Sequence, residues 1–253
     1  MKMLRDVGLL YRRGLIHTLR IPVWVVVGIS TPLLYLALFT PLLQNLAGAP
    51  GFPPTDVLDL FLPGILALMA FGSGTGAGFA IIFEIQAGFT ERLQVSPASR
   101  FALLMGPVLS SLTWTYIFTI MIVAVAIPFG FHLHLAGMLV SLVLLGLLLM
   151  VFASFSIALA LITKEISSLA AIMNGINLPV LLLSGVLLPL SLAPTWMRAI
   201  AHMNPMYYVV EANRILATGT IYDAKVGEAF LIMVPLTVVV MAWATRVYRR
   251  AVS

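Results

Sequence analysis

The feature that most constrains this chain is a series of long apolar runs. There are six of them, with approximate limits at residues 22–44, 60–83, 102–127, 136–163, 167–190 and 229–245. A helix needs roughly 20 apolar residues to cross the hydrocarbon core of a bilayer. Because 61% of the residues are hydrophobic and only 9% are charged, a soluble fold could not bury the apolar surface. We therefore expect an all-α integral membrane protein with six transmembrane helices in one domain, residues 1–253.

The positions of lysine and arginine predict the orientation of these helices. Eleven of the 14 Lys and Arg residues lie in the segments that would share one side, and only Arg198, Arg214 and Lys225 lie on the other. Since cytoplasmic segments carry the excess of Lys and Arg, we expect both termini in the cytoplasm. A cleaved signal peptide is the alternative for the first run, but the stretch between Arg20 and Asp56 has no charge and is too long for one.

The segment before the first apolar run, residues 2–20, is amphipathic. At a helical spacing, one arc holds Leu4, Val7, Tyr11, Leu15 and Leu19, whereas most of the arginines lie on the opposite arc. Such a helix is expected to lie in the headgroup plane with its arginines toward anionic lipid. The alternative is a basic tail that only fixes the topology.

A glycine-rich stretch, GSGTGAGF at residues 72–79, fits a dinucleotide-binding fingerprint. That fingerprint has meaning only between a strand and a helix of a soluble βαβ unit, whereas this stretch falls inside an apolar run. Here Gly72 with Gly76, and Gly74 with Gly78, form two overlapping GxxxG pairs. Small residues at this spacing let helix backbones approach closely in lipid, so the stretch predicts tight helix packing or a flexible point in the span.

The chain lacks the residues that several kinds of binding or catalytic site require. There are no cysteines, and none of the three lysines follows a glycine as a Walker A loop requires, so the chain is predicted to hold no ATP or other cofactor. Ionisable residues lie at the ends of the spans, which disfavours an ion-coupled transporter. His132 and His134 have no carboxylate near in sequence, so we expect no metal site. No catalytic spacing is present, and the chain is not expected to be an enzyme by itself or to bind nucleic acid.

Two polar pairs stand out in otherwise apolar helices. Glu211 and Arg214 are three residues apart, and we expect an ion pair on one helix face. Asn174 and Asn177 are also three residues apart, inside the fifth run. Buried amides in lipid either hydrogen-bond to neighbouring helices or line a polar path, and the sequence leaves both roles open.

Two connections between the runs are long or charged enough to carry function. The inner loop, residues 84–100, has four charges and a possible short helix before Pro97, suited to contact a soluble partner or simply to face solvent. The outer connection, residues 191–228, is too long to be structureless in a compact protein. It contains two helical pieces, each too short to cross the membrane, separated by Asn204 and Pro205.

These two connections resemble those of the type-2 ABC transporter permease family. In residues 178–214 an apolar helix with SG precedes a P-x-W turn, an NP pair and an aromatic helix that ends in arginine, which is similar to the family's carboxy-terminal signature. The inner loop resembles the family's E…G…E-x-L…SP loop through Glu84, Glu91, Arg92, Leu93, Ser96 and Pro97. The six-span plan with an amphipathic start covers the whole chain.

The resemblance implies the membrane half of a transporter. Such permeases dimerise and pair with two copies of a separate ATP-binding subunit, which would hold the ATP and magnesium. The residues that couple to the ATPase would be Glu84, Glu91, Arg92, Leu93 and Pro97. Outer re-entrant helices between spans 5 and 6 would form a gate with Pro194, Trp196, Asn204 and Pro205. By inference from this arrangement, Gly72, Gly76, Asn174 and Asn177 would lie near the path.

The function expected from this resemblance is export. The chain looks most like the daunorubicin-type drug exporters of the bacterial plasma (inner) membrane, and the apolar spans favour a hydrophobic or amphipathic cargo. Export of a lipid-linked polysaccharide or a lipo-oligosaccharide is the alternative within the family. A membrane scaffold or receptor that transports nothing is the alternative from another class.

Overall fold

A computed structural model describes residues 2–44, 57–86, 100–186, 190 and 193–251, and this part of the chain contains helices and no strands. The first helices are α1 (Lys2–Arg20), α2 (Pro22–Gln44), α3 (Val57–Gln86) and α5 (Arg100–Ala126), followed by a 3-10 turn η1 (Ile127–Phe129). The remaining helices are α6 (Leu135–Thr163), α7 (Ile166–Leu182), α8 (Thr195–Ala201), α9 (Pro205–Ala217) and α10 (Ala224–Ala251). The predicted all-α class is confirmed.

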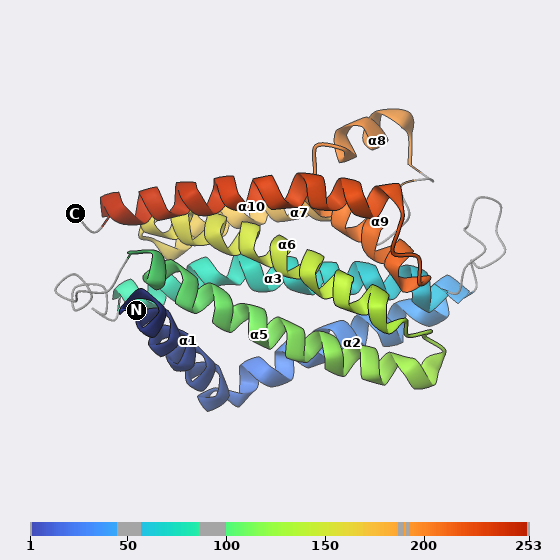
Figure 1. Cartoon of the computed structure of the whole chain (residues 1–253), viewed down its shortest axis with the longest axis horizontal. Helices are drawn as coiled ribbons and strands as arrows, with labels where there is room; N and C mark the ends of the chain where they lie inside the picture. The colour runs from blue at the N-terminus through green and yellow to red at the C-terminus, as the bar shows by residue number, and fades with distance from the viewer. Residues whose placement is uncertain (1, 45–56, 87–99, 187–189, 191–192, 252–253) are drawn as a thin grey trace.

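The long helices run side by side along the long axis of the molecule (Figure 1). The start of α1 and the end of α10 lie at the same end of this bundle, at the left of the view. The turns that join α5 to α6 and α9 to α10 lie at the opposite end. This arrangement agrees with the predicted topology, in which both termini share one side. We call the end with the termini the inner end and the other the outer end.

Helix α6 lies at the centre of the core because it is apolar on every face. It contacts α3, α5, α7, α9 and α10. Four of its leucines, Leu144, Leu145, Leu148 and Leu149, are completely buried. Leu139 and Val143 stay exposed on its outer face, and a helix that is hydrophobic all round is typical of a membrane span.

Four helices are long and apolar enough to cross a membrane: Leu58–Gln86, Phe101–Phe129, Leu135–Thr163 and Ala224–Arg250. Helices α1 and α2 together count as a fifth if their bent pair, with an angle of 73°, is one span. Helix α7 has 17 residues and belongs with the shorter apolar helices. Helices therefore lie in all six predicted runs, and four or five of them are candidate spans by length and composition.

The fifth apolar run ends as a helix at Leu182, eight residues before its predicted limit of 190. The cause is the Ser184-Gly185 pair. Gly185 has a φ of +73°, which is the left-handed conformation that commonly ends helices and that glycine adopts without steric cost. The Ser184 hydroxyl donates a hydrogen bond to the Leu181 carbonyl and accepts one from the Val186 amide, which fixes the turn.

The predicted amino-terminal amphipathic helix is confirmed as α1, which also packs against α5. The Tyr11 hydroxyl lies 3.0 Å from the Thr113 hydroxyl. A Cβ placed on Gly14 would lie 2.7 Å from the Ser110 hydroxyl. Because Gly14 has no side chain, α1 and α5 can approach this closely. Leu19, on the apolar arc of the helix, is exposed. The helix therefore has a protein-facing side as well as an exposed apolar one.

The glycine-rich stretch lies within α3, so it is not the loop that a dinucleotide site requires. The two GxxxG pairs face different ways. Gly74 and Gly78 are buried against α6, whereas Gly72 and Gly76 are exposed and have no neighbouring atom within 4 Å of a Cβ built on either residue. The Gly78 amide donates a hydrogen bond to the Ser156 hydroxyl at 3.2 Å, and that hydroxyl donates to the Thr75 carbonyl at 2.6 Å. The tight packing is confirmed for the inward pair.

Candidate functional site

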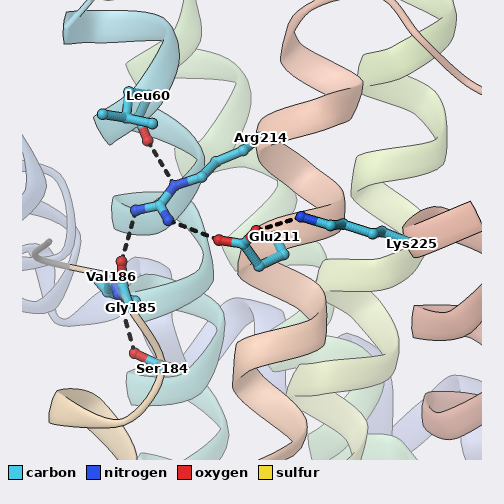
Figure 2. Close-up of polar contacts among 7 residues, drawn as sticks. All are labelled: Leu60, Ser184, Gly185, Val186, Glu211, Arg214 and Lys225. Carbon is cyan, nitrogen blue, oxygen red and sulfur yellow. Dashed lines mark hydrogen bonds and ion pairs between the residues drawn. The ribbon is translucent and has the colours of Figure 1, made fainter. Parts of the chain in front are cut away.

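Arg214 joins three segments at the outer end of the bundle (Figure 2). Its Nε donates to the carbonyl of Leu60 in α3 at 3.1 Å. One terminal nitrogen donates to the carbonyl of Gly185, in the turn after α7, at 2.6 Å. The other terminal nitrogen lies 3.1 Å from Glu211, one turn earlier on α9. The ion pair between Glu211 and Arg214 was predicted, and the two carbonyl partners are additional.

Arg214 is only 8% exposed, and the carboxylate of Glu211 beside it balances its positive charge. Burial lowers the pKa of Arg214 from its ordinary value, and the charge and hydrogen bond of Glu211 oppose this shift. The guanidinium nevertheless stays protonated, because arginine is not deprotonated in proteins. The second carboxylate oxygen of Glu211 accepts from the Nζ of Lys225, at the start of α10, at 3.0 Å. The site therefore ties α10 to the same cluster.

The turn after α7 is pressed against α3 beside this cluster. Val186 is completely buried, and a Cβ placed on Gly64 would lie 2.9 Å from the Val186 carbonyl oxygen. Only glycine permits this approach without a shift of the backbone. Because Gly64 lies one helical turn from Leu60, the backbone contact and the Arg214 hydrogen bond act on the same part of α3.

The amino end of α9 is tied to α7 by Asn204, one of the predicted outer-gate residues. Its side-chain oxygen accepts from the Met206 amide at 3.0 Å, which caps α9. Its side-chain nitrogen donates to the Val180 carbonyl at 2.7 Å. Val180 is in the last turn of α7, where carbonyls lack partners within the helix. Pro205 follows as the first residue of α9, a position that needs no amide hydrogen.

We expect Asn204→Ala to destabilise the protein by about 2–3 kcal/mol. The loss of the cap costs about 1 kcal/mol and the orphaned Val180 carbonyl adds about 1–2 kcal/mol. Asn204→Ser is the matched variant, because serine also caps a helix but is too short to reach α7, and it should lose about half as much. Thermal unfolding in detergent measures both. If Asn204→Ala unfolds at the wild-type temperature, Asn204 does not hold α9 in place.

The other two predicted gate residues lie away from this junction. Pro194 and Trp196 belong to α8 and its cap, and both are exposed, Trp196 to 64%. Helix α8 stands outside the bundle in Figure 1. The structure therefore brings Asn204 and Pro205 to the packed end of α7 and places Pro194 and Trp196 on a separate, outlying helix.

The residues predicted to line the path all lie on the surface of the single chain. Gly72 and Gly76 are exposed on α3, and Asn174 and Asn177 are exposed on α7. Helices α3 and α7 contact each other. Helix α7 buries only Leu169 and Met173. In a single protomer, the neighbouring helices α3 and α7 therefore expose apolar side chains, glycines and side-chain amides.

Of the predicted coupling residues, the structure describes Glu84. It lies in the last turn of α3, where its carboxylate is 3.0 Å from Arg13 of α1. This ion pair joins the amphipathic helix to the point where the inner loop begins. Glu91, Arg92, Leu93 and Pro97 lie outside the described residues.

The two outer histidines have structural partners. His132 lies 3.3 Å from the carboxylate of Asp59, a residue distant in sequence. The Nδ1 of His134 lies 3.0 Å from the carbonyl of Ala217 at the end of α9. Across the described segments, no group of three or more His, Cys, Asp or Glu residues is placed to hold a metal ion.

The fold and the outer junction define a multi-pass membrane protein whose fifth and sixth apolar runs are joined by two short helices, the packed α9 and the outlying α8. The chain matches the ABC-2 type transporter family over residues 5–217, and it belongs to that family. It is 30% identical over 246 residues to "Putative transport permease ycf38" of Cyanophora paradoxa, covering 91% of this chain and 84% of the relative. It is 28% identical to the protein of the same name from Pyropia yezoensis, covering 85% of this chain and 74% of the relative.

Family membership confirms the coarser part of the sequence prediction. The chain is the transmembrane permease of an ABC-2 type transporter, a subunit that is not itself catalytic. Permeases of this kind pair with ATP-binding subunits. Sequence reasoning missed the contacts of Arg214 with α3 and with the turn after α7. The signal for them was an arginine near the end of a short outer helix with one acidic residue, Glu211, beside it.

Proposed function

We propose that this permease exports a hydrophobic or amphipathic compound, such as a drug or a lipid-like molecule. The observation that carries the proposal is the absence of charge inside the spans. No Asp, Glu, Lys or Arg occurs in residues 60–83, 101–163 or 229–245. A strongly charged cargo or a coupling ion would need such residues within the membrane. The buried Arg214 does not supply one, because Glu211 and two backbone carbonyls already satisfy it.

The working unit in this proposal is a dimer of the permease with two copies of an ATP-binding subunit, which hold ATP and magnesium. The exposed faces of α3 and α7, with Gly72, Gly76, Asn174 and Asn177, support a path between two protomers. The inner loop, residues 84–100, would contact the ATPase. We place the complex in a bacterial plasma membrane with both termini in the cytoplasm, in keeping with the distribution of Lys and Arg.

A second candidate is the export of a lipid-linked saccharide, and one observation favours it. At the turn between α8 and α9, the rings of His202, Tyr207 and Tyr208 contact one another, with centroids 5.1–6.1 Å apart. His202 is exposed and the two tyrosines are partly exposed. Amphipathic rings of this kind offer both an apolar face and hydrogen-bonding groups to a sugar at the outer end.

Reconstitution in liposomes with the partner ATPase tests the proposal and separates its alternatives. For an exporter of hydrophobic compounds, amphipathic drugs should stimulate ATP hydrolysis, and lipid-linked saccharides should not. The reverse pattern would replace the first candidate by the second. A scaffold or receptor would show no stimulation by either class, and that result would contradict export altogether.

A further inference from the structure

From the carboxy-terminal part of α9, one side chain makes charge-assisted hydrogen bonds to two other segments. The guanidinium of Arg214 donates to Leu60 of α3 and to Gly185 of the turn after α7, as Figure 2 shows. Both acceptors are backbone carbonyls in segments far from α9 in sequence. Hydrogen bonds from a charged donor are roughly twice as strong as neutral ones. Movement of α9 away from both α3 and the turn after α7 must therefore break two strong bonds at one residue.

The other end of α9 is held to the same helix, α7. There Asn204 donates to the Val180 carbonyl. The acceptors of the hydrogen bonds from Asn204 and Arg214, Val180 and Gly185, lie just before and just after the end of α7 at Leu182. Helix α9 is thus fixed at both ends to the last turn of α7 and the turn that follows it, and Arg214 also hydrogen-bonds it to α3.

The hydrogen bonds from Arg214 to α3 and to the turn after α7 can break and form again without leaving a charge unpaired. Glu211 neutralises Arg214 from within α9, so the ion pair would move with the helix and no charge would be left unpaired. Lys225 contacts Glu211 from the start of α10 and is itself 54% exposed. Release would break the two bonds to backbone carbonyls and open the packing of the buried apolar residues of α9. The freed carbonyls could then bind water at the outer end.

We propose that Arg214 is the positioning residue of the outer gate: it holds α9 against α3 and the turn after α7 in the resting state, and this hold is released when the outer end opens. The opening step rests on the proposed export function. The resting hold does not, because it follows from the contacts of the chain alone.

Arg214→Lys tests this role, since it keeps the positive charge beside Glu211 but removes the planar fork that reaches two carbonyls. The chain has no cysteine, so a single Val210→Cys reporter can be labelled from the outer side with a water-soluble thiol reagent. Val210 is on α9 and is completely buried, so labelling requires α9 to move. Without nucleotide, we expect Arg214→Lys to speed this labelling by about tenfold, the effect of losing one charge-assisted hydrogen bond.

Two controls distinguish a movement of α9 alone from a loosening of the whole bundle. Leu148→Cys, completely buried in α6, should stay unlabelled in both backgrounds. Arg198→Lys, which changes an exposed arginine of α8, should leave labelling of Val210→Cys unchanged. If Arg214→Lys speeds labelling at both reporter positions, or at neither, the positioning role is overturned. Should Arg214→Lys fail to assemble, Arg214→Gln also removes the guanidinium that reaches both carbonyls and leaves Glu211 paired with Lys225, and unchanged labelling in that variant overturns the role as well.

Hydrolysis by the purified complex distinguishes failure of the gate from failure of the proposed function. If export is correct, Arg214→Lys should raise ATP hydrolysis in the absence of cargo and reduce the further stimulation by cargo. Faster labelling without any cargo-dependent hydrolysis in the wild type would uphold the resting hold and contradict export. Normal hydrolysis with unchanged labelling would uphold export and contradict the role of Arg214.

Discussion

Gly78→Ala is expected to destabilise the bundle by about 1–3 kcal/mol, the usual cost of overpacking. A Cβ on Gly78 would lie 2.7 Å from the carbonyl carbon of Ser156 in α6. Helix backbones cannot yield as a flexible side chain can, so α3 and α6 must separate. The hydrogen bond from the Gly78 amide to the Ser156 hydroxyl would be lost with the contact. In detergent, the variant should unfold roughly 2–12 °C below the wild type.

Gly76→Ala is the matched control, two residues earlier on the same helix. Nothing lies within 4 Å of a Cβ at Gly76, and alanine is a better helix former than glycine by about 1 kcal/mol. The single protomer should therefore be unaffected or slightly more stable. Equal unfolding temperatures for Gly76→Ala and Gly78→Ala would contradict the packing of α3 on α6. Ser156→Ala should not rescue Gly78→Ala, because the clash also involves the backbone of Ser156.

Replacing both Glu91 and Arg92 by alanine is expected to abolish transport while the fold stays intact. The inner loop is proposed to carry the contact with the ATPase, and these two charges are its most polar part. A loss of coupling by tenfold or more corresponds to at least about 1.4 kcal/mol, within the usual range for coupled sites. Cargo-stimulated hydrolysis should fall to the basal rate, and thermal unfolding of the permease should not change.

The turn between α6 and α7 provides the control for this double variant. Lys164→Ala with Glu165→Ala also removes one positive and one negative charge at the inner end, in a much shorter connection. It should retain most of the transport activity. Normal transport by an assembled Glu91 and Arg92 double variant would show that the coupling contact lies elsewhere.

The positions of the helices could be predicted from the sequence because apolar runs of the right length have few other solutions in a bilayer. The end of α7 could not be predicted from hydropathy, since residues 183–190 continue the apolar run. What ends the helix is the Ser184-Gly185 turn, with Gly185 at positive φ, and the contact of Val186 with Gly64 holds this turn against α3. The latter is a tertiary contact, and apolar composition does not reveal it.

The glycine stretch shows a similar limit. Spacing predicts that one helix face can approach another closely, but Gly72 and Gly74 point to opposite sides of α3, about 200° apart. Only the position of α6 decides which pair is packed. Arg214 shows the limit for a functional residue. Its ion pair with Glu211 follows from an i,i+3 spacing, whereas its bonds to Leu60 and Gly185 use backbone carbonyls, which every residue possesses.

The central claim is that this chain is one half of an ATP-driven transporter, and purification from its native membrane tests it most directly. A tagged copy is isolated in mild detergent, the proteins bound to it are identified by mass spectrometry, and ATP hydrolysis is measured on the complex. We predict a soluble P-loop protein in an equal molar amount and hydrolysis by the complex. A chain that is isolated alone and inactive, under conditions that preserve known complexes, would contradict the account.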